Sequence, residues 1–75
     1  MTQKTKKKDT YIGVDKAKSI ALTKVPGAVV VKVEFDKDDG VPVYEVKLVK
    51  DEFEYEIKIH AKTGKILEVE REYND

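Results

Sequence analysis

Hydrophobic and polar residues alternate with a period of two over most of the chain beyond residue 28. Such alternation predicts β-strands, because successive side chains of a strand point to opposite faces of the sheet. We therefore expect four strands, at 29–35, 43–49, 53–60 and about 66–73. The polar segments between them are rich in Asp, Gly and Lys, as turns require. The second half of the chain should thus be an antiparallel sheet built from hairpins.

The segment before these strands has a different period. Ala17, Ile20 and Ala21 are spaced three and four residues apart, which places them on one face of a helix. We expect this helix at about 14–24, with Gly13 as its N-cap and Pro26-Gly27 ending it. The predicted fold class is therefore α+β, with one N-terminal helix packed on a four-stranded antiparallel meander sheet.

The pairing of the strands should keep the apolar side chains together on the face that the helix covers. This requirement predicts the following pairs: Phe35 with Tyr44, Val33 with Val46, Val31 with Leu48, Leu48 with Phe53, Val46 with Tyr55, Tyr44 with Ile57, Ile57 with Val69, and Ile59 with Leu67. It leaves a three-residue loop, Lys62-Thr63-Gly64, whose glycine supplies a positive φ. Val29 should share the covered face with Val31, and Tyr73 should close the core near Phe53.

Two surfaces of this predicted sheet are candidate partner-binding sites. In the expected register Glu34 lies opposite Glu45, Glu45 opposite Glu56, and Glu56 opposite Glu70, so four carboxylates form one row across the open face. This row could receive a basic surface or a cation, or it could be a solvated face with fluctuating ion pairs. The second candidate is the outer edge of the first strand.

That edge carries Val29 and Val31 and has Lys32 as its one charged residue within "AVVVKV" (28–33). An unpaired strand edge can accept an extended peptide or a second copy of the chain. Alternatively, the connection to the helix covers these valines. We expect a monomer or a weak edge-paired dimer.

The charge distribution separates a tail from a body. The chain has 75 residues and no net charge, but its first ten residues are basic, with Lys4, Lys6, Lys7 and Lys8, and the remainder is acidic. We expect residues 1–11 to be a disordered basic tail and residues 12–75 to form a single domain. No apolar stretch follows the lysines, so the tail as it stands is not a signal peptide. No apolar run approaches the roughly 18 residues of a membrane span.

The residues that carry catalysis or bind metals are scarce. Cysteine is absent, Ser19 is the one serine and falls within the predicted helix, and His60 is the one histidine. "DKDDG" (36–40) does not match a calcium loop, because Lys47 occupies the twelfth position, where a glutamate is required. We expect no catalytic residue, no cofactor and no metal site.

Five segments together carry a family resemblance: "IGVDKAKSIAL" (12–22), "VPGAVVVKVEF" (25–35), "VYEVKLV" (43–49), "FEYEIKI" (53–59) and "AKTGKILEVE" (61–70). In this order the chain resembles the PepSY domain, over about residues 12–72. The domain is named for propeptides of thermolysin-type metallopeptidases and for an accessory protein of spore germination. His60 stands where that pattern commonly has an aspartate, and Gly13 where it has a serine or threonine.

The resemblance implies a non-catalytic module located outside the cytoplasm, secreted or in the cell envelope, that binds or inhibits a peptidase or another protein. Two alternatives remain open. The chain could be a structural or ligand-sensing small domain, designed or excised from a longer protein. It could also bind nucleic acid through its basic tail, although the acidic body opposes this.

Overall fold

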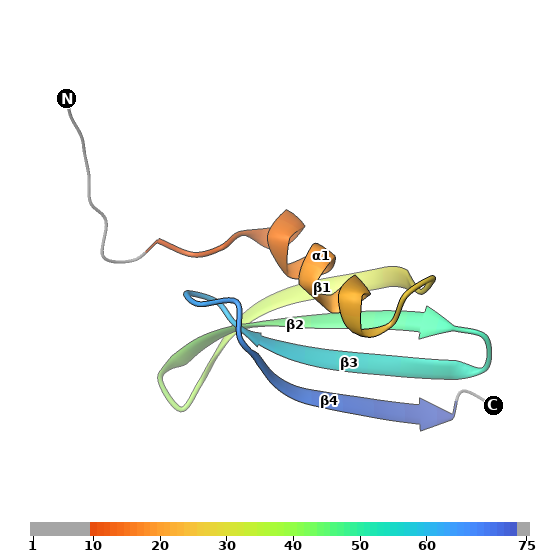
Figure 1. Ribbon diagram of the computed structural model, residues 1–75. Coiled ribbons are helices and arrows are strands. Elements are labelled where there is room, and N and C mark those ends of the chain that lie inside the picture. Colours follow the sequence, from red (N-terminus) through yellow and green to blue (C-terminus); the bar gives the residue numbers. More distant parts are fainter. Residues whose placement is uncertain (1–9, 74–75) are drawn as a thin grey trace.

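The computed structural model describes residues 10–73 and confirms the predicted α+β fold class. One helix, α1 (Val14–Lys24), precedes four strands, β1 (Val29–Asp38), β2 (Val41–Lys50), β3 (Phe53–His60) and β4 (Ile66–Tyr73). The strands form one antiparallel sheet in the order β1-β2-β3-β4 (Figure 1). Of the predicted tail, residues 1–9 lie outside the described part of the chain.

The core lies between α1 and the two central strands. Ala17 and Ala21 on the helix are fully buried, and because their side chains are small the helix approaches the sheet closely. The sheet contributes larger side chains, all of them buried: Tyr44, Val46, Leu48, Ile57 and Ile59. The apolar face of the helix and the apolar face of the strands therefore form one buried layer.

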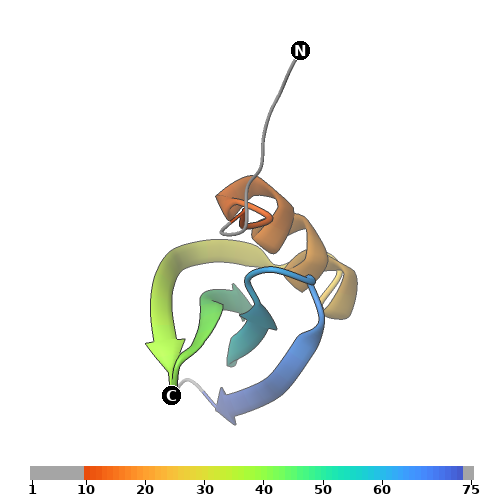
Figure 2. The ribbon, with the colours of Figure 1, turned by 90° about the vertical axis from the view of Figure 1, so that its left-hand side faces the viewer.

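The helix covers only part of the sheet. It contacts β1 and β2, whereas the β4 side chains on the same face stay open, with Val69 45% exposed and Tyr73 63% exposed. Tyr73 does contact the ring of Phe53, at 5.8 Å between centroids, but it does not close the core as predicted. Figure 2 shows β1 and β4 curving away from α1 on either side of the central strands, so the face opposite the helix is concave.

The pairing of β1 with β2 agrees with the prediction up to a bulge. Phe35 pairs with Tyr44 and Val33 with Val46, but Val30 takes the expected place of Val31 opposite Leu48. The extra residue at position 31 shifts the register and reverses the faces of the residues before it. Val29 and Val31 are consequently 61% and 53% exposed instead of covered.

The predicted register of β2 with β3 is wrong by two residues. Leu48 pairs with Tyr55 instead of Phe53, Val46 with Ile57, and Tyr44 with Ile59. The cause is a tight turn: Lys50 pairs with Phe53, which leaves only residues 51 and 52 in the loop. Asp51 adopts φ 57 in this turn, a left-handed conformation that Asp tolerates better than most residues. The shift by two preserves the face of every side chain.

The pairing of β3 with β4 matches the prediction for Ile57 and Val69 but not near the turn. Ile59 pairs with Ile66 instead of Leu67, because Leu67 is the extra residue of a second irregularity. The loop between the strands is also longer than predicted, since the His60 N–H donates to the Lys65 carbonyl at 2.8 Å. Gly64 has the expected positive φ, 82°.

Ala61, the residue directly after β3, positions the segment that leads into α1. Its N–H donates to the Pro42 carbonyl, and its own carbonyl accepts a hydrogen bond from the Ile12 N–H, both at 2.8 Å. The ring of Tyr11 then lies 5.0 Å from that of Phe35. These contacts hold the segment before α1 against the ends of β1, β2 and β3.

Candidate functional site

The open face of the sheet carries the predicted glutamates, but in two rows instead of one. Glu34 lies opposite Glu45 and Glu56 opposite Glu70, as predicted. Glu45, however, pairs with Lys58 and not with Glu56. The two-residue shift between β2 and β3 causes this change, so the continuous row of four carboxylates does not exist. Glu56 lies opposite Lys47.

Carboxylates nevertheless dominate the concave side of the sheet. Two adjoining hollows, of about 90 and 70 Å³, lie there side by side and share Glu56 and Glu70. We call their combined lining the acidic trough; its residues are Glu45, Lys47, Glu54, Tyr55, Glu56, Lys58, Glu68, Glu70 and Glu72. Both hollows are far smaller than the roughly 300 to 1,000 Å³ of small-molecule pockets. Their size suits the end of a single side chain.

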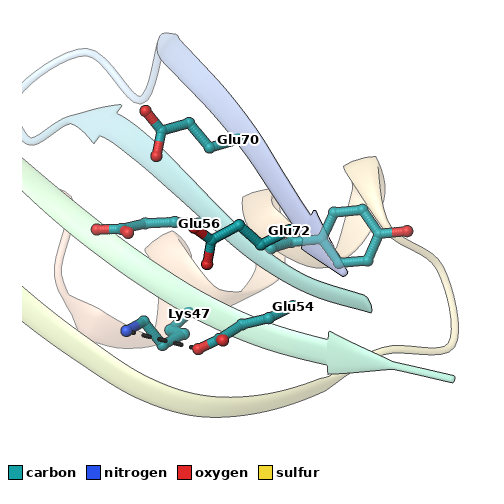
Figure 3. A pocket seen from close by; sticks show the side chains of 6 residues that line it. Lys47, Glu54, Glu56, Glu70 and Glu72 are labelled. Atoms are coloured by element: carbon teal, nitrogen blue, oxygen red, sulfur yellow. Dashed lines mark ion pairs between the residues drawn. The ribbon is translucent and has the colours of Figure 1, made fainter. Parts of the chain in front are cut away.

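The lysines of the trough pair with carboxylates at its margins. Lys47 Nζ lies 3.5 Å from Glu54 (Figure 3), and Lys58 Nζ lies 2.7 Å from Asp38 and 3.6 Å from Glu68. In Figure 3 the carboxylates of Glu56 and Glu70 lie above the Lys47–Glu54 ion pair, and the helix lies behind the sheet. Among residues 10–73 no ion pair involves Glu45, Glu56 or Glu70. The middle of the trough is therefore negatively charged.

Two carboxyl groups respond to this charge. Burial, followed by repulsion from Glu56, raises the pKa of Glu45 above its usual value, although Lys58 partly opposes the shift. A hydrogen bond with Glu68 and repulsion by the same carboxylate raise the pKa of Glu70. Both groups hold their negative charge less readily than in water, and a cation near Glu56, which repels both of them, would relieve part of this repulsion.

The second candidate surface lies at the outer edge of β1. Val29 and Val31, which the sequence analysis selects, are both exposed there, and the bulge at position 31 separates them from the core. A groove of about 290 Å³ runs between this strand and α1. Its lining is Val14, Lys18, Val30, Val31, Lys32 and Val33. Of the two predicted valines, Val31 lines this partly apolar groove and Val29 does not.

Each surface also contains residues that were not predicted from the sequence. Glu54, Glu68 and Glu72 belong to the trough, and alternation along each strand could have found them, since Glu68 and Glu72 share the face of Glu70 on β4 and Glu54 shares that of Glu56 on β3. Val14 and Lys18 border the groove, but no sequence signal identifies them. Their position depends on how the helix packs, which the period of the helix does not specify.

The sparse chemistry-bearing residues lie apart from both surfaces. His60 Nδ1 accepts a hydrogen bond from the Lys62 N–H at 3.1 Å, which gives this side chain a structural role in the turn after β3. Ser19 is exposed on α1. Within residues 10–73 no group of three or more His, Cys, Asp or Glu side chains is arranged to hold a metal ion. The same residues include no helix long and apolar enough to span a membrane.

A solved structure with the same fold is that of a protein from Clostridium difficile 630, described as a "putative lipoprotein". The two are 35% identical, with a TM-score of 0.78. The likeness covers 88% of this chain but only 43% of the other, so this chain spans less than half of that protein's length. No curated protein matches the chain.

A family model decides the assignment. The model of the peptidase propeptide and YPEB domain, PepSY, matches residues 11–70. This range begins at Tyr11, which packs on Phe35, and includes α1, the first three strands and most of β4. The sequence resemblance, the fold and the family match agree, and the chain belongs to the PepSY family.

Proposed function

We propose that this protein is a non-catalytic module that acts outside the cytoplasm and binds a peptidase through the acidic trough. The observation that carries the proposal is the trough itself, an open concave surface whose central carboxylates have no ion-pair partner among residues 10–73. A partner that inserts a lysine or arginine side chain between Glu45, Glu56 and Glu70 supplies the missing positive charge. The family, named for peptidase propeptides, supports the choice of a peptidase.

The location outside the cytoplasm rests on similarity. PepSY domains are associated with peptidases, and the solved structure of the same fold is described as a "putative lipoprotein". Small domains outside the cytoplasm are often stabilised by disulfide bonds, but this chain has no cysteine. Packing alone must therefore stabilise the domain there. The buried layer between α1 and the central strands is the source of that stability.

The trough also separates this proposal from nucleic-acid binding. Protein surfaces that bind nucleic acids place lysine and arginine against the phosphates. The concave face places Glu45, Glu56 and Glu70 there instead, and these carboxylates would repel a phosphate backbone. Complementary charge favours a basic protein surface as the partner.

The test is binding to a thermolysin-type metallopeptidase, measured by calorimetry together with inhibition of peptide hydrolysis. We expect the wild-type protein to bind, with affinity that falls as salt increases. The double variant Glu45→Gln/Glu56→Gln should bind about tenfold more weakly at low salt, the scale of one or two lost charge contacts. Glu52→Gln is the matched control, because Glu52 lies in the exposed β2–β3 turn outside the trough.

Two results would contradict the proposal. If the wild-type protein neither binds nor inhibits the peptidase, the choice of partner is wrong. If it binds but the double variant and the control bind equally well, another surface makes the contact. Circular dichroism of each variant establishes that a loss of binding does not reflect a loss of fold.

A further inference from the structure

We propose that the outer edge of β1 is a self-association site, at which two copies of this chain pair β1 with β1 in antiparallel orientation. The occupant of the edge is thus a second copy, related by a twofold axis through Val33. The proposal concerns the outer edge of β1, at the margin of the sheet, and none of residues 31–35 lines the acidic trough. It does not depend on the peptidase-binding function.

The edge offers both the backbone and the apolar surface that such pairing needs. β1 is the first strand of the sheet and pairs only with β2, so one side of its backbone has no strand partner among the described residues. Val31 and Phe35 are 53% and 45% exposed along this strand. Pairing with an identical strand would satisfy the free backbone groups and cover these side chains.

The charges on β1 select one register. An antiparallel pair centred on Val33 places Lys32 of each copy opposite Glu34 of the other. The same register places Val31 opposite Phe35, at the groove between α1 and β1, which Val31 lines. Shifting the centre by one position to Lys32 sets Lys32 against its own copy, and shifting it to Glu34 sets two glutamates together. Opposite charges directly across from each other stabilise a strand pair, and like charges destabilise it.

The charges also exclude the other edge. The β4 residues on the open face are Glu68, Glu70 and Glu72, so pairing β4 with its own copy brings glutamates together. If β1 of one copy pairs with β4 of another so that Lys32 lies opposite the middle one of these glutamates, Glu34 lies opposite the next glutamate along β4. One of the two pairs then always joins like charges. Only the symmetric β1–β1 contact neutralises both charges, and it closes as a dimer instead of extending into a fibre.

The bulge limits the strength of this contact. The extra residue at position 31 interrupts the regular strand, so pairing on its N-terminal side would lose register. The shared segment is therefore residues 31–35, a short contact that we expect to form a weak, concentration-dependent dimer. Within one chain Lys32 Nζ already lies 3.2 Å from the Glu34 carboxylate. In the dimer the two lysines and two glutamates of both copies would form a group of four in which each charge has opposite charges as its neighbours.

The experiment uses charge reversal and mixing. Analytical ultracentrifugation of the wild-type protein up to about 1 mM should show dimers, since association with a Kd near that value remains visible there. Lys32→Glu and Glu34→Lys should each weaken association by about tenfold or more, because each change creates two like-charge pairs by symmetry. An equal mixture of the two variants should restore association, since each heterodimer again pairs Lys with Glu at both positions.

Lys37→Glu is the matched control. It makes the same change of charge on the same strand but outside residues 31–35, and it should associate like the wild type. A wild-type protein that stays monomeric at about 1 mM overturns the proposal. So does a Lys32→Glu variant that dimerises as well as wild type, or a mixture of folded variants that fails to associate. Circular dichroism and thermal unfolding confirm that each variant is folded.

Discussion

At the scale of single residues, the turn after β3 depends on one glycine for two reasons. Gly64 has φ 82, where a side chain is strained, and a Cβ added there would lie 3.2 Å from Ile20 Cδ1 on the helix. The backbone conformation is visible in the sequence as a glycine in a short polar loop. The close approach of the helix is not, because it depends on the packing of α1 against the sheet.

Gly64→Ala should therefore destabilise the fold more than an equivalent change elsewhere. Gly40 is the matched position, since it also has φ 82 but a Cβ there meets nothing within 4 Å. We expect Gly40→Ala to lower the free energy of unfolding by about 1 kcal/mol, the cost of the left-handed backbone. Gly64→Ala should cost roughly 2 kcal/mol, because Ile20 must also shift. Urea unfolding measures both, and equal losses would contradict the contact with Ile20.

Glu45 should make stability depend on pH. Its pKa is raised in the folded protein, so the folded state binds a proton more readily than the unfolded state does. The resulting stabilisation is fully present below the usual value of 4.5 and is lost as pH rises through the folded pKa. At neutral pH the charged form of Glu45 is therefore a small liability.

Glu45→Gln should raise the free energy of unfolding at pH 7 by roughly a few tenths of a kcal/mol, the scale of exposed like-charge pairs. It should also flatten the decline in stability between about pH 4.5 and neutrality. Chemical denaturation at several pH values measures both effects, with Glu52→Gln as the control. A loss of stability at pH 7 would show that the pairing of Glu45 with Lys58 outweighs burial and repulsion.

At the scale of elements, the alternation of residues predicts the strands and their faces but not their register. Moving β3 by two positions against β2 leaves Tyr55 and Ile57 on the covered face in either case, so the apolar pattern cannot distinguish the two arrangements. The turn decides, because Asp51 accepts a positive φ and allows a two-residue loop. The predicted row of four glutamates failed for this reason.

Bulges escape sequence analysis for a related reason. In "AVVVKV" both parities are apolar up to Val31, so no polar residue reveals that the faces are exchanged there. Glu34 and Glu45 lie beyond the bulge, and their pairing was predicted correctly. The prediction of the β1 side-chain faces was thus confirmed where polar residues mark the face, and it was wrong where valines follow one another.

The same valine-to-alanine substitution at two positions measures how unequally α1 covers the sheet. Val46 and Val69 are the two cross-strand partners of Ile57, but Val46 is fully buried and Val69 is 45% exposed. Val46→Ala should lower the free energy of unfolding by about 2 to 3 kcal/mol, through lost burial and a cavity beneath α1. Val69→Ala should cost about 0.5 kcal/mol or less. Equal losses in urea unfolding would mean that β4 is also covered.

At the scale of the whole molecule, the two faces and the outer edge of the sheet have different surroundings. One face of the sheet is covered by α1 over the central strands, the opposite face forms the acidic trough, and the outer edge of β1 has no strand partner among residues 10–73. The class of fold, the helix and the four strands were predictable from the sequence. The concavity of the trough was not predictable, because it arises from the coiling of the sheet.

The partial cover by the helix also bears on how the molecule opens. β4 is held by hydrogen bonds to β3 and by few buried side chains, whereas β2 has neighbours on both sides and the helix above it. Local unfolding begins where buried contacts are fewest. We therefore expect the last strand to separate while the central strands stay paired, so that its amide protons exchange with solvent, and its backbone is cleaved by a protease, sooner than those of the central strands.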